Sequence, residues 1–138
     1  GRAEQHQLKA VMSFSSSVIA VRDVKQGDKV GYGGTWTAPA DTRLAVVAVG
    51  YGDGYPKAAS NGCPVLIKGE RYPIVGRVSM DMTTVDIGNA DVQIGDEVLL
   101  WGANLPVEEI AEQVQTIPYE LLCNITSRVE FRYLNAES

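Results

Sequence analysis

Two glycine-rich segments each hold a tyrosine between glycines, and a tyrosine side chain can take or give a proton. Residues 31–34 carry Tyr32, and residues 50–56 carry Tyr51. Neither segment has the glycine spacing of a dinucleotide-binding or triphosphate-binding loop. Flanking glycines allow sharp turns and the close approach of another surface. Both segments are therefore predicted to be loops that hold a tyrosine at the rim of the domain.

Acid–base chemistry by a tyrosine needs a neighbouring cation, because a phenol with its ordinary pKa near 10 is protonated at neutral pH. Arg77 is the most suggestive cation in the chain. A simpler interpretation of these residues stays open. Tyr32 and Tyr51 can be turn residues that pack one end of the domain. Arg77 can be a surface residue paired with Asp81 or Asp86.

Other polar residues also have two interpretations. Asp53 lies between glycines, where an aspartate is more typical of a turn acceptor than of a catalytic acid. Tyr119 and Arg128 flank a predicted helical turn and could bind an anion, although a tyrosine at a helix start is often a packing residue. His6 is the sole histidine, so no metal site is expected. No complete catalytic set is visible in the sequence.

Composition limits the class of protein. The 138 residues are 45% hydrophobic and carry a formal net charge of -5, which fits one globular domain and disfavours nucleic acid as a ligand. The apolar run at residues 44–49 is too short to cross a membrane. The first twenty residues lack the pattern of a signal peptide. Cys63 and Cys123 form no close pair, and we expect reduced thiols in a cytoplasmic protein.

The elements that must position these residues are mostly strands, because glycines punctuate short β-branched stretches. Residues 25–28 have the character of a hairpin turn that leads into the next strand, and residues 68–69 give a short hairpin signal. Residues 44–49 are continuously apolar, which indicates a strand covered on both faces. We predict strands at residues 11–21, from residue 29 or 30, and at 44–49, 64–67, 70–72, 74–78, 82–87, 97–101 and 128–133.

One segment has helical periodicity. Val107, Ile110, Ala111 and Val114 recur at the spacing of one helix face, with Pro106 acceptable at the first helical position. Residues 119–124 are predicted to form a second short helical turn. The fold class is therefore mainly β, a barrel-like or sandwich domain of about eight strands with one or two short helices.

Several of these segments, in the same order, resemble the carboxy-terminal β-domain of bacterial alanine racemases. They are residues 30–37, 50–56, 73–81, 105–111 and 126–128. Family members are fold-type III pyridoxal phosphate enzymes. The resemblance implies that residues 1–138 are the β-domain alone. It also implies an amino-terminal (β/α)8 barrel that holds the cofactor and is absent from this chain, and a head-to-tail homodimer that places each β-domain over the partner's barrel.

The resemblance assigns the catalytic role in this chain to Tyr32, which matches the family's tyrosine base. It would take the α-proton of L-alanine, and a lysine of the absent barrel would serve the D-alanine direction. Because the site is shared between subunits, the cation that tunes Tyr32 would come from the partner, and the chain alone would be inactive.

Further roles follow from the same resemblance. Met80 matches the position whose backbone N–H meets the substrate carboxylate, and Tyr119 matches a tyrosine that contacts the cofactor phosphate. Tyr51, Arg77 and Asp81 match residues that line the substrate corridor. Pyridoxal 5'-phosphate is the implied cofactor, alanine the substrate, and D-alanine for peptidoglycan the implied product, although the resemblance also leaves a catabolic role open.

Two alternatives remain at this stage. Related racemases and decarboxylases of the same fold type carry similar β-domains, so the substrate side chain is less closely specified than the cofactor. The chain could also be a β-barrel dimerisation module without catalysis.

Overall fold

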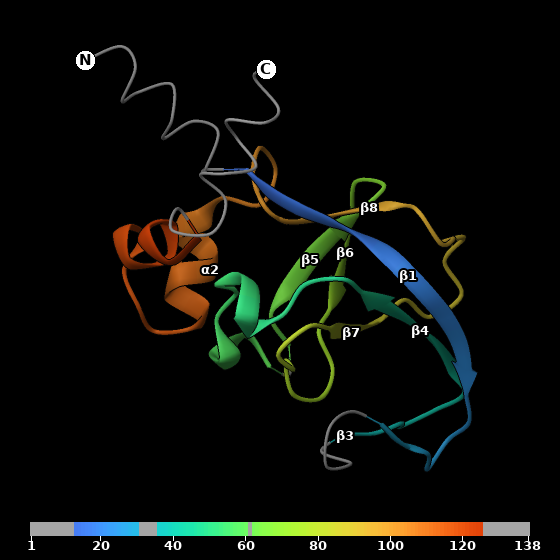
Figure 1. The fold of residues 1–138 in the computed structure, drawn as a ribbon. Coiled ribbons are helices and arrows are strands. Elements are labelled where there is room, and N and C mark those ends of the chain that lie inside the picture. Colours follow the sequence, from blue (N-terminus) through green and yellow to red (C-terminus); the bar gives the residue numbers. More distant parts are fainter. Residues whose placement is uncertain (1–12, 31–35, 61, 126–138) are drawn as a thin grey trace.

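A six-stranded antiparallel sheet forms the body of the molecule in a computed structural model that describes residues 13–30, 36–60 and 62–125. Figure 1 shows the sheet curling around the core. Its strands lie in the order β6-β5-β8-β1-β4-β7. Their bounds are β1 Phe14–Val24, β4 Thr42–Val47, β5 Pro64–Ile67, β6 Glu70–Pro73, β7 Thr83–Asp86 and β8 Glu97–Trp101.

The sheet nearly closes into a barrel between its edge strands β6 and β7. An isolated bridge joins Ile74 to Val85, and the Val75 N–H donates to Thr84 O at 2.9 Å. The long strand β1 pairs with β8 through its first residues and with β4 through the rest. Its register shifts between Val18 and Ala20, and such a bulge increases local twist, which helps the sheet to curl.

A small second sheet covers the outer face of β4. It consists of β2 (Lys29–Val30) and β3 (Trp36–Thr37), paired antiparallel. Leu44 is fully buried there in a cluster with Val24, Val30, Ala38 and Val75. Ala45 and Val47 are buried in the main core on the other face. This confirms the prediction of a strand covered on both faces.

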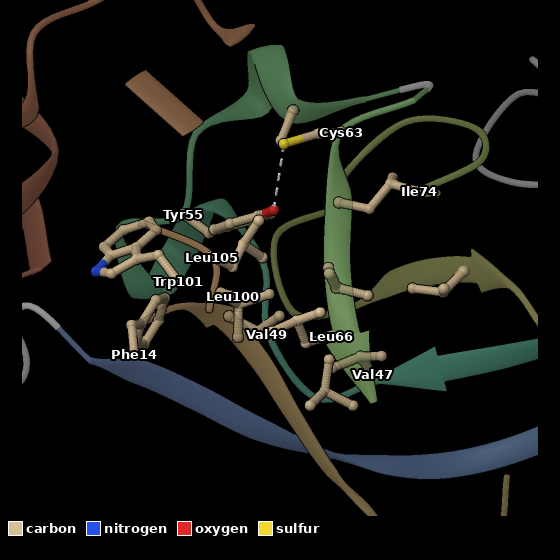
Figure 2. Packing of buried hydrophobic residues seen from close by; sticks show 14 of the residues in the cluster. Phe14, Val47, Val49, Tyr55, Cys63, Leu66, Ile74, Leu100, Trp101 and Leu105 are labelled. Carbon is tan, nitrogen blue, oxygen red and sulfur yellow. Dashed lines mark hydrogen bonds between the residues drawn. The ribbon is translucent and has the colours of Figure 1, made fainter. Parts of the chain in front are cut away.

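The main core contains three packed aromatic rings, which Figure 2 shows beside one end of the barrel. The Trp101 ring centroid lies 5.1 Å from that of Phe14 and 6.3 Å from that of Tyr55. The Tyr55 hydroxyl points to the Cys63 thiol, with oxygen and sulfur 3.9 Å apart. Burial raises the pKa of Tyr55 well above its ordinary value and that of Cys63 to about 11. Both groups are therefore neutral at physiological pH. The buried Tyr55 side chain fixes the glycine-rich segment 50–56 to the main core.

Two helices pack beside this aromatic end (Figure 1). Helix α2 spans Val107–Gln113 and buries Val107, Ile110 and Ala111, as the periodicity predicts. Pro106 is its N-cap rather than its first helical residue. Residues 118–125 are also helical.

Most strand predictions are confirmed to within three residues, and the structure has eight strands in its described ranges. The prediction of a strand at 74–78 is wrong, because only Ile74 makes a bridge and Gly76 has a φ of 73° that turns the chain. A hydrogen bond from Asp28 N–H to Lys25 O confirms a turn at 25–28. The predicted hairpin there is wrong, because β1 pairs with β4 and β8 whereas β2 pairs with β3. The predicted strand at 128–133 and the start of the one at 11–21 lie outside the described residues.

Replacing Glu109 with glutamine tests the contact between β6 and α2. Both terminal nitrogens of the Arg71 guanidinium donate to the Glu109 carboxylate, Nη2 to Oε1 at 2.9 Å. This holds the pKa of Glu109 below its ordinary value. A carboxyl whose pKa falls on folding adds stability above its unfolded pKa and loses it as the pH drops through the folded pKa. We expect Glu109→Gln to lower the free energy of unfolding in urea at pH 7, by a difference that shrinks below about pH 4.

The matched control is Glu108→Gln, since both glutamates lie in the first turn of α2 and share its dipole. The Glu108 side chain is exposed and should show a smaller difference at pH 7. A destabilisation by Glu109→Gln that does not change with pH would contradict this account.

Candidate functional site

Two loops, residues 49–54 and 78–83, lie against each other and carry three of the six predicted site residues, Tyr51, Met80 and Asp81. We call them the paired loops. The first contains the 3-10 helix η2 (Tyr51–Asp53), and the second leads into β7. Three hydrogen bonds join them, from Tyr51 N–H to Ser79 O at 3.0 Å, from Gly52 N–H to Met80 O at 2.9 Å, and from Thr83 Oγ1 to Val49 O at 2.6 Å.

Gly50 is required by this contact. Its φ of -152° is open to any residue, but a methyl group on its α-carbon would overlap Ser79 O and Met80 O. The sequence predicts that these glycines admit another surface, and that surface proves to be the chain's own second loop. Asp53 accepts from the Gly50 N–H at 3.1 Å, which confirms its predicted role as a turn acceptor.

Tyr51 lies at the rim as predicted, with 41% of its surface exposed. The Lys57 ammonium lies 4.3 Å from the centre of its ring, a cation–π contact that could not be predicted from the residue spacing. Lys57 begins the 3-10 helix η3 (Lys57–Ala59). Ser60 ties this helix to the second loop, since its hydroxyl donates to Lys57 O at 2.7 Å and accepts from Val78 N–H at 2.9 Å.

Met80 protrudes from the second loop, with 56% of its surface exposed. Its carbonyl is fixed by Gly52, whereas its N–H meets no hydrogen-bond acceptor among the residues that the structure describes. A backbone N–H that is fixed in place and has no acceptor can donate a hydrogen bond to a group from outside, such as a carboxylate.

Arg77 and Asp81 are both exposed, and they flank Met80 in the sequence at a separation of three residues and one residue. The predicted pairing of Arg77 with Asp81 or Asp86 is wrong within the described ranges, where neither carboxylate forms an ion pair with it. Asp86 instead accepts from the Thr42 hydroxyl at 2.6 Å. Arg77 and Asp81 thus remain available to charged groups from outside these ranges.

Tyr119 lies on the helical segment 118–125 with 72% of its surface exposed, so it is not a packing residue here. Leu121 and Ile125 of the same segment are buried and hold it on the core. A hydrogen bond with the Cys123 thiol raises the pKa of Tyr119 above its ordinary value. A phenol is protonated at neutral pH in any case, and the exposed hydroxyl is accessible to an anion.

The helical segment 118–125 also backs onto the first paired loop. Gly54, with a φ of 94°, leaves no room for a side chain, because a β-carbon would lie 2.8 Å from Asn124 O. No hydrogen bond links Tyr119 to Tyr51 or Met80 in the described part of the chain. The structure therefore places Tyr51 and Met80 on loops that are in direct contact. Tyr119 is connected to these loops only through the packing of its helical segment, 118–125, against Gly54.

Tyr32 and Arg128 lie outside the described residues. The flanking strands β2 and β3 are described, and their pairing of Val30 with Trp36 frames the segment that contains Tyr32. Sequence reasoning missed the residues that fasten the paired loops, Lys57, Ser60, Ser79 and Thr83. Three of them have small hydroxyl side chains, and nothing in the sequence near a serine or threonine indicates which distant backbone group it will bind.

The described residues can supply only part of a site for pyridoxal phosphate. One exposed phenol, Tyr119, can donate a single hydrogen bond to a phosphate, and a phosphate dianion needs several donors. This fits a cofactor whose phosphate is held mainly by residues outside the described ranges. Among residues 13–30, 36–60 and 62–125, no three histidine, cysteine, aspartate or glutamate residues gather as a metal site would require. None of their helices has the length and apolar character of a membrane span.

The comparisons with known proteins agree with the geometry. The family model "Alanine racemase, C-terminal domain" matches residues 11–133. The chain is 56% identical over 133 residues to the alanine racemase of Photobacterium profundum, covering 96% of this chain and 37% of that protein. It is 60% identical over 126 residues to the biosynthetic alanine racemase of Salmonella typhimurium, covering 91% and 35%.

Solved structures show the same similarity. The biosynthetic alanine racemase of Pseudomonas aeruginosa superposes with a TM-score of 0.80 at 46% identity, over 84% of this chain and 33% of that chain. The alanine racemase of Bartonella henselae, solved with covalently bound pyridoxal phosphate, gives 0.79 at 35% identity, over 82% and 32%. The chain thus spans little more than a third of the length of the relatives that it matches.

Proposed function

Because this chain belongs to the alanine racemase C-terminal domain family, we propose that it is part of an alanine racemase that interconverts L-alanine and D-alanine. The observation that carries the proposal is the match to alanine racemases at 56% identity over 96% of the chain. The chain spans 37% of that relative, so the remaining length is proposed to supply the amino-terminal barrel.

Racemisation requires two bases on opposite faces of the α-carbon, one to remove the proton and one to replace it. Bound pyridoxal phosphate would supply the electron sink that makes this proton removable. Tyr32 is proposed to take the proton from L-alanine. A lysine of the barrel, outside this chain, would act on the other face.

Substrate binding is assigned to the paired loops. Met80 is proposed to donate its backbone N–H to the substrate carboxylate. Two observations support this: the N–H has no acceptor among residues 13–30, 36–60 and 62–125, and the Met80 carbonyl is fixed by Gly52. Tyr51, Arg77 and Asp81 are proposed to line the route by which the zwitterion enters. Their exposure at the rim supports this assignment.

Tyr119 is proposed to contact the cofactor phosphate. The exposure of its side chain, 72%, supports a role as a hydrogen-bond donor to an anion from outside the described residues. The barrel would provide the other phosphate donors.

The site is proposed to be shared in a homodimer, with each β-domain facing the partner's barrel. Large apolar side chains left exposed around the paired loops and the helical segment support a covering partner. They are Tyr51, Met80, Met82, Ile117 and Tyr119, exposed by 41% to 72%. We propose a cytoplasmic enzyme that supplies D-alanine for peptidoglycan, in keeping with its two free thiols and its similarity to a biosynthetic racemase.

Purified full-length protein tests this proposal directly. We expect it to racemise alanine, to lose activity when pyridoxal phosphate is removed and to regain activity when the cofactor is returned. We expect residues 1–138 alone to be inactive and to leave the absorption spectrum of added pyridoxal phosphate unchanged. Racemisation of another amino acid in preference to alanine, or decarboxylation, would replace the substrate assignment. Activity of the chain alone would contradict the shared site.

A further inference from the structure

Ser79 uses every polar group that it has within the paired loops. Its carbonyl accepts from Tyr51 N–H at 3.0 Å, and its N–H donates to Met82 O at 3.0 Å. Its hydroxyl donates to Met82 O at 2.8 Å and accepts from Met82 N–H at 3.0 Å. One side chain thus holds both the donor and the acceptor of Met82.

These contacts close a tight turn whose two central residues are Met80 and Asp81. The first paired loop holds this turn from one side, through the hydrogen bond from Gly52 N–H to Met80 O. The Ser79 hydroxyl holds it from within. The Met80 N–H has no acceptor in the described part of the chain. In the backbone it lies between Ser79, which is held by its contacts with Met82, and the Met80 carbonyl, which is held by Gly52.

Only a short side chain with a donor and an acceptor on one atom can make both hydroxyl contacts. Serine and threonine meet this requirement, whereas alanine and valine do not. Removal of the hydroxyl would leave the Met82 N–H without its acceptor and remove one of the two donors to Met82 O. The turn would then be closed by the Ser79 N–H alone.

We propose that Ser79 is a positioning residue for substrate binding, because its hydroxyl fixes the direction of the Met80 N–H toward the substrate carboxylate. This rests on the proposed function. The hydroxyl acts through the turn and does not touch the substrate. A contact with the carboxylate is made equally in the ground state and in the transition state, so its loss raises KM and leaves kcat nearly unchanged.

The test compares Ser79→Val and Ser79→Thr in the full-length enzyme with pyridoxal phosphate bound. These side chains have nearly the same shape and differ in the hydroxyl. We expect the valine variant to have a KM for alanine, and an inhibition constant for propionate, about tenfold higher than the threonine variant, the loss that follows when a hydrogen bond to a charged group is misdirected. We expect the kcat values to agree within about twofold.

Ser79→Ala should behave as the valine variant does. Ser16→Ala is the matched control, because the Ser16 hydroxyl also donates to a backbone carbonyl, that of Ala48, at 2.7 Å but outside the paired loops. Its KM should equal that of the unmodified enzyme. Thermal unfolding of each variant shows whether any change in KM follows loss of the fold.

Equal KM and propionate inhibition in the valine and threonine variants would overturn the role of Ser79, as would a loss confined to kcat. These outcomes differ from a failure of the proposed function, which would appear as an unmodified enzyme that does not racemise alanine.

Discussion

Replacement of Tyr32 by phenylalanine in the full-length enzyme is expected to lower the rate of alanine racemisation by at least about a hundredfold, the usual contribution of a positioned general base. The loss should fall equally on kcat/KM in both directions, because the two enantiomers have equal free energy and every turnover uses both bases. The change removes one oxygen atom and keeps the ring. Polarimetry or a coupled D-amino-acid assay measures the rate.

Exchange of the α-hydrogen with deuterated water separates the two bases. The Tyr32→Phe variant should lose exchange of L-alanine and retain exchange of D-alanine, on which the lysine acts. Tyr72→Phe is the control, since Tyr72 lies on β6 and is outside the proposed site, and it should change the rate by less than about twofold. Undiminished racemisation by Tyr32→Phe, with the cofactor bound, would return Tyr32 to the interpretation of a turn residue.

Replacement of Gly50 by alanine is expected to cost about 3 kcal/mol of unfolding free energy, the upper end of what overpacking usually costs. The backbone at Gly50 is open to any residue, so the cost comes from the methyl group against Ser79 O and Met80 O. Neither carbonyl can move without breaking a hydrogen bond between the paired loops. Urea denaturation of residues 1–138 measures the loss.

Gly102→Ala is the matched control. A β-carbon there would meet chiefly the end of the Leu99 side chain, at 3.0 Å, and a flexible side chain can move aside. We expect a loss below about 1 kcal/mol. Equal losses at Gly50 and Gly102 would show that the paired loops are not rigidly held. In the full-length enzyme Gly50→Ala should also raise the KM for alanine, since it displaces Met80.

Local sequence patterns were enough to predict the β5–β6 hairpin and helix α2. The hairpin of β5 and β6 follows from Lys68 and Gly69, which adopt positive φ at the predicted turn. Helix α2 follows from one apolar face. A strand was wrongly predicted at 74–78 because the apolar residues of this segment are buried in two different hydrophobic clusters. Ile74 and Val78 enter the main core and Val75 enters the cluster under β2 and β3, which alternation alone cannot distinguish from a strand.

The paired loops could not be predicted from the sequence. Gly50 and Gly52 signalled a close approach, but the second loop lies almost thirty residues away in the sequence. Two of the three hydrogen bonds between the loops join backbone groups, which leave no signal in the sequence. The roles of Tyr32, Met80 and Tyr119 came from the resemblance to a family. The types and spacing of the residues in this chain do not by themselves form a complete catalytic set.

The central claim is that this domain lends Tyr32 to the site of the partner subunit, and mixing two inactive variants tests it most directly. One subunit carries Tyr32→Phe, and the other lacks the barrel lysine that serves as the opposing base. A hybrid dimer then has one site with both bases only if Tyr32 acts across the interface. We predict that random reassortment restores about one quarter of the unmodified activity, since half the dimers are hybrids with one intact site each. A mixture that contains hybrid dimers, separated by two affinity tags, and stays inactive would contradict the claim.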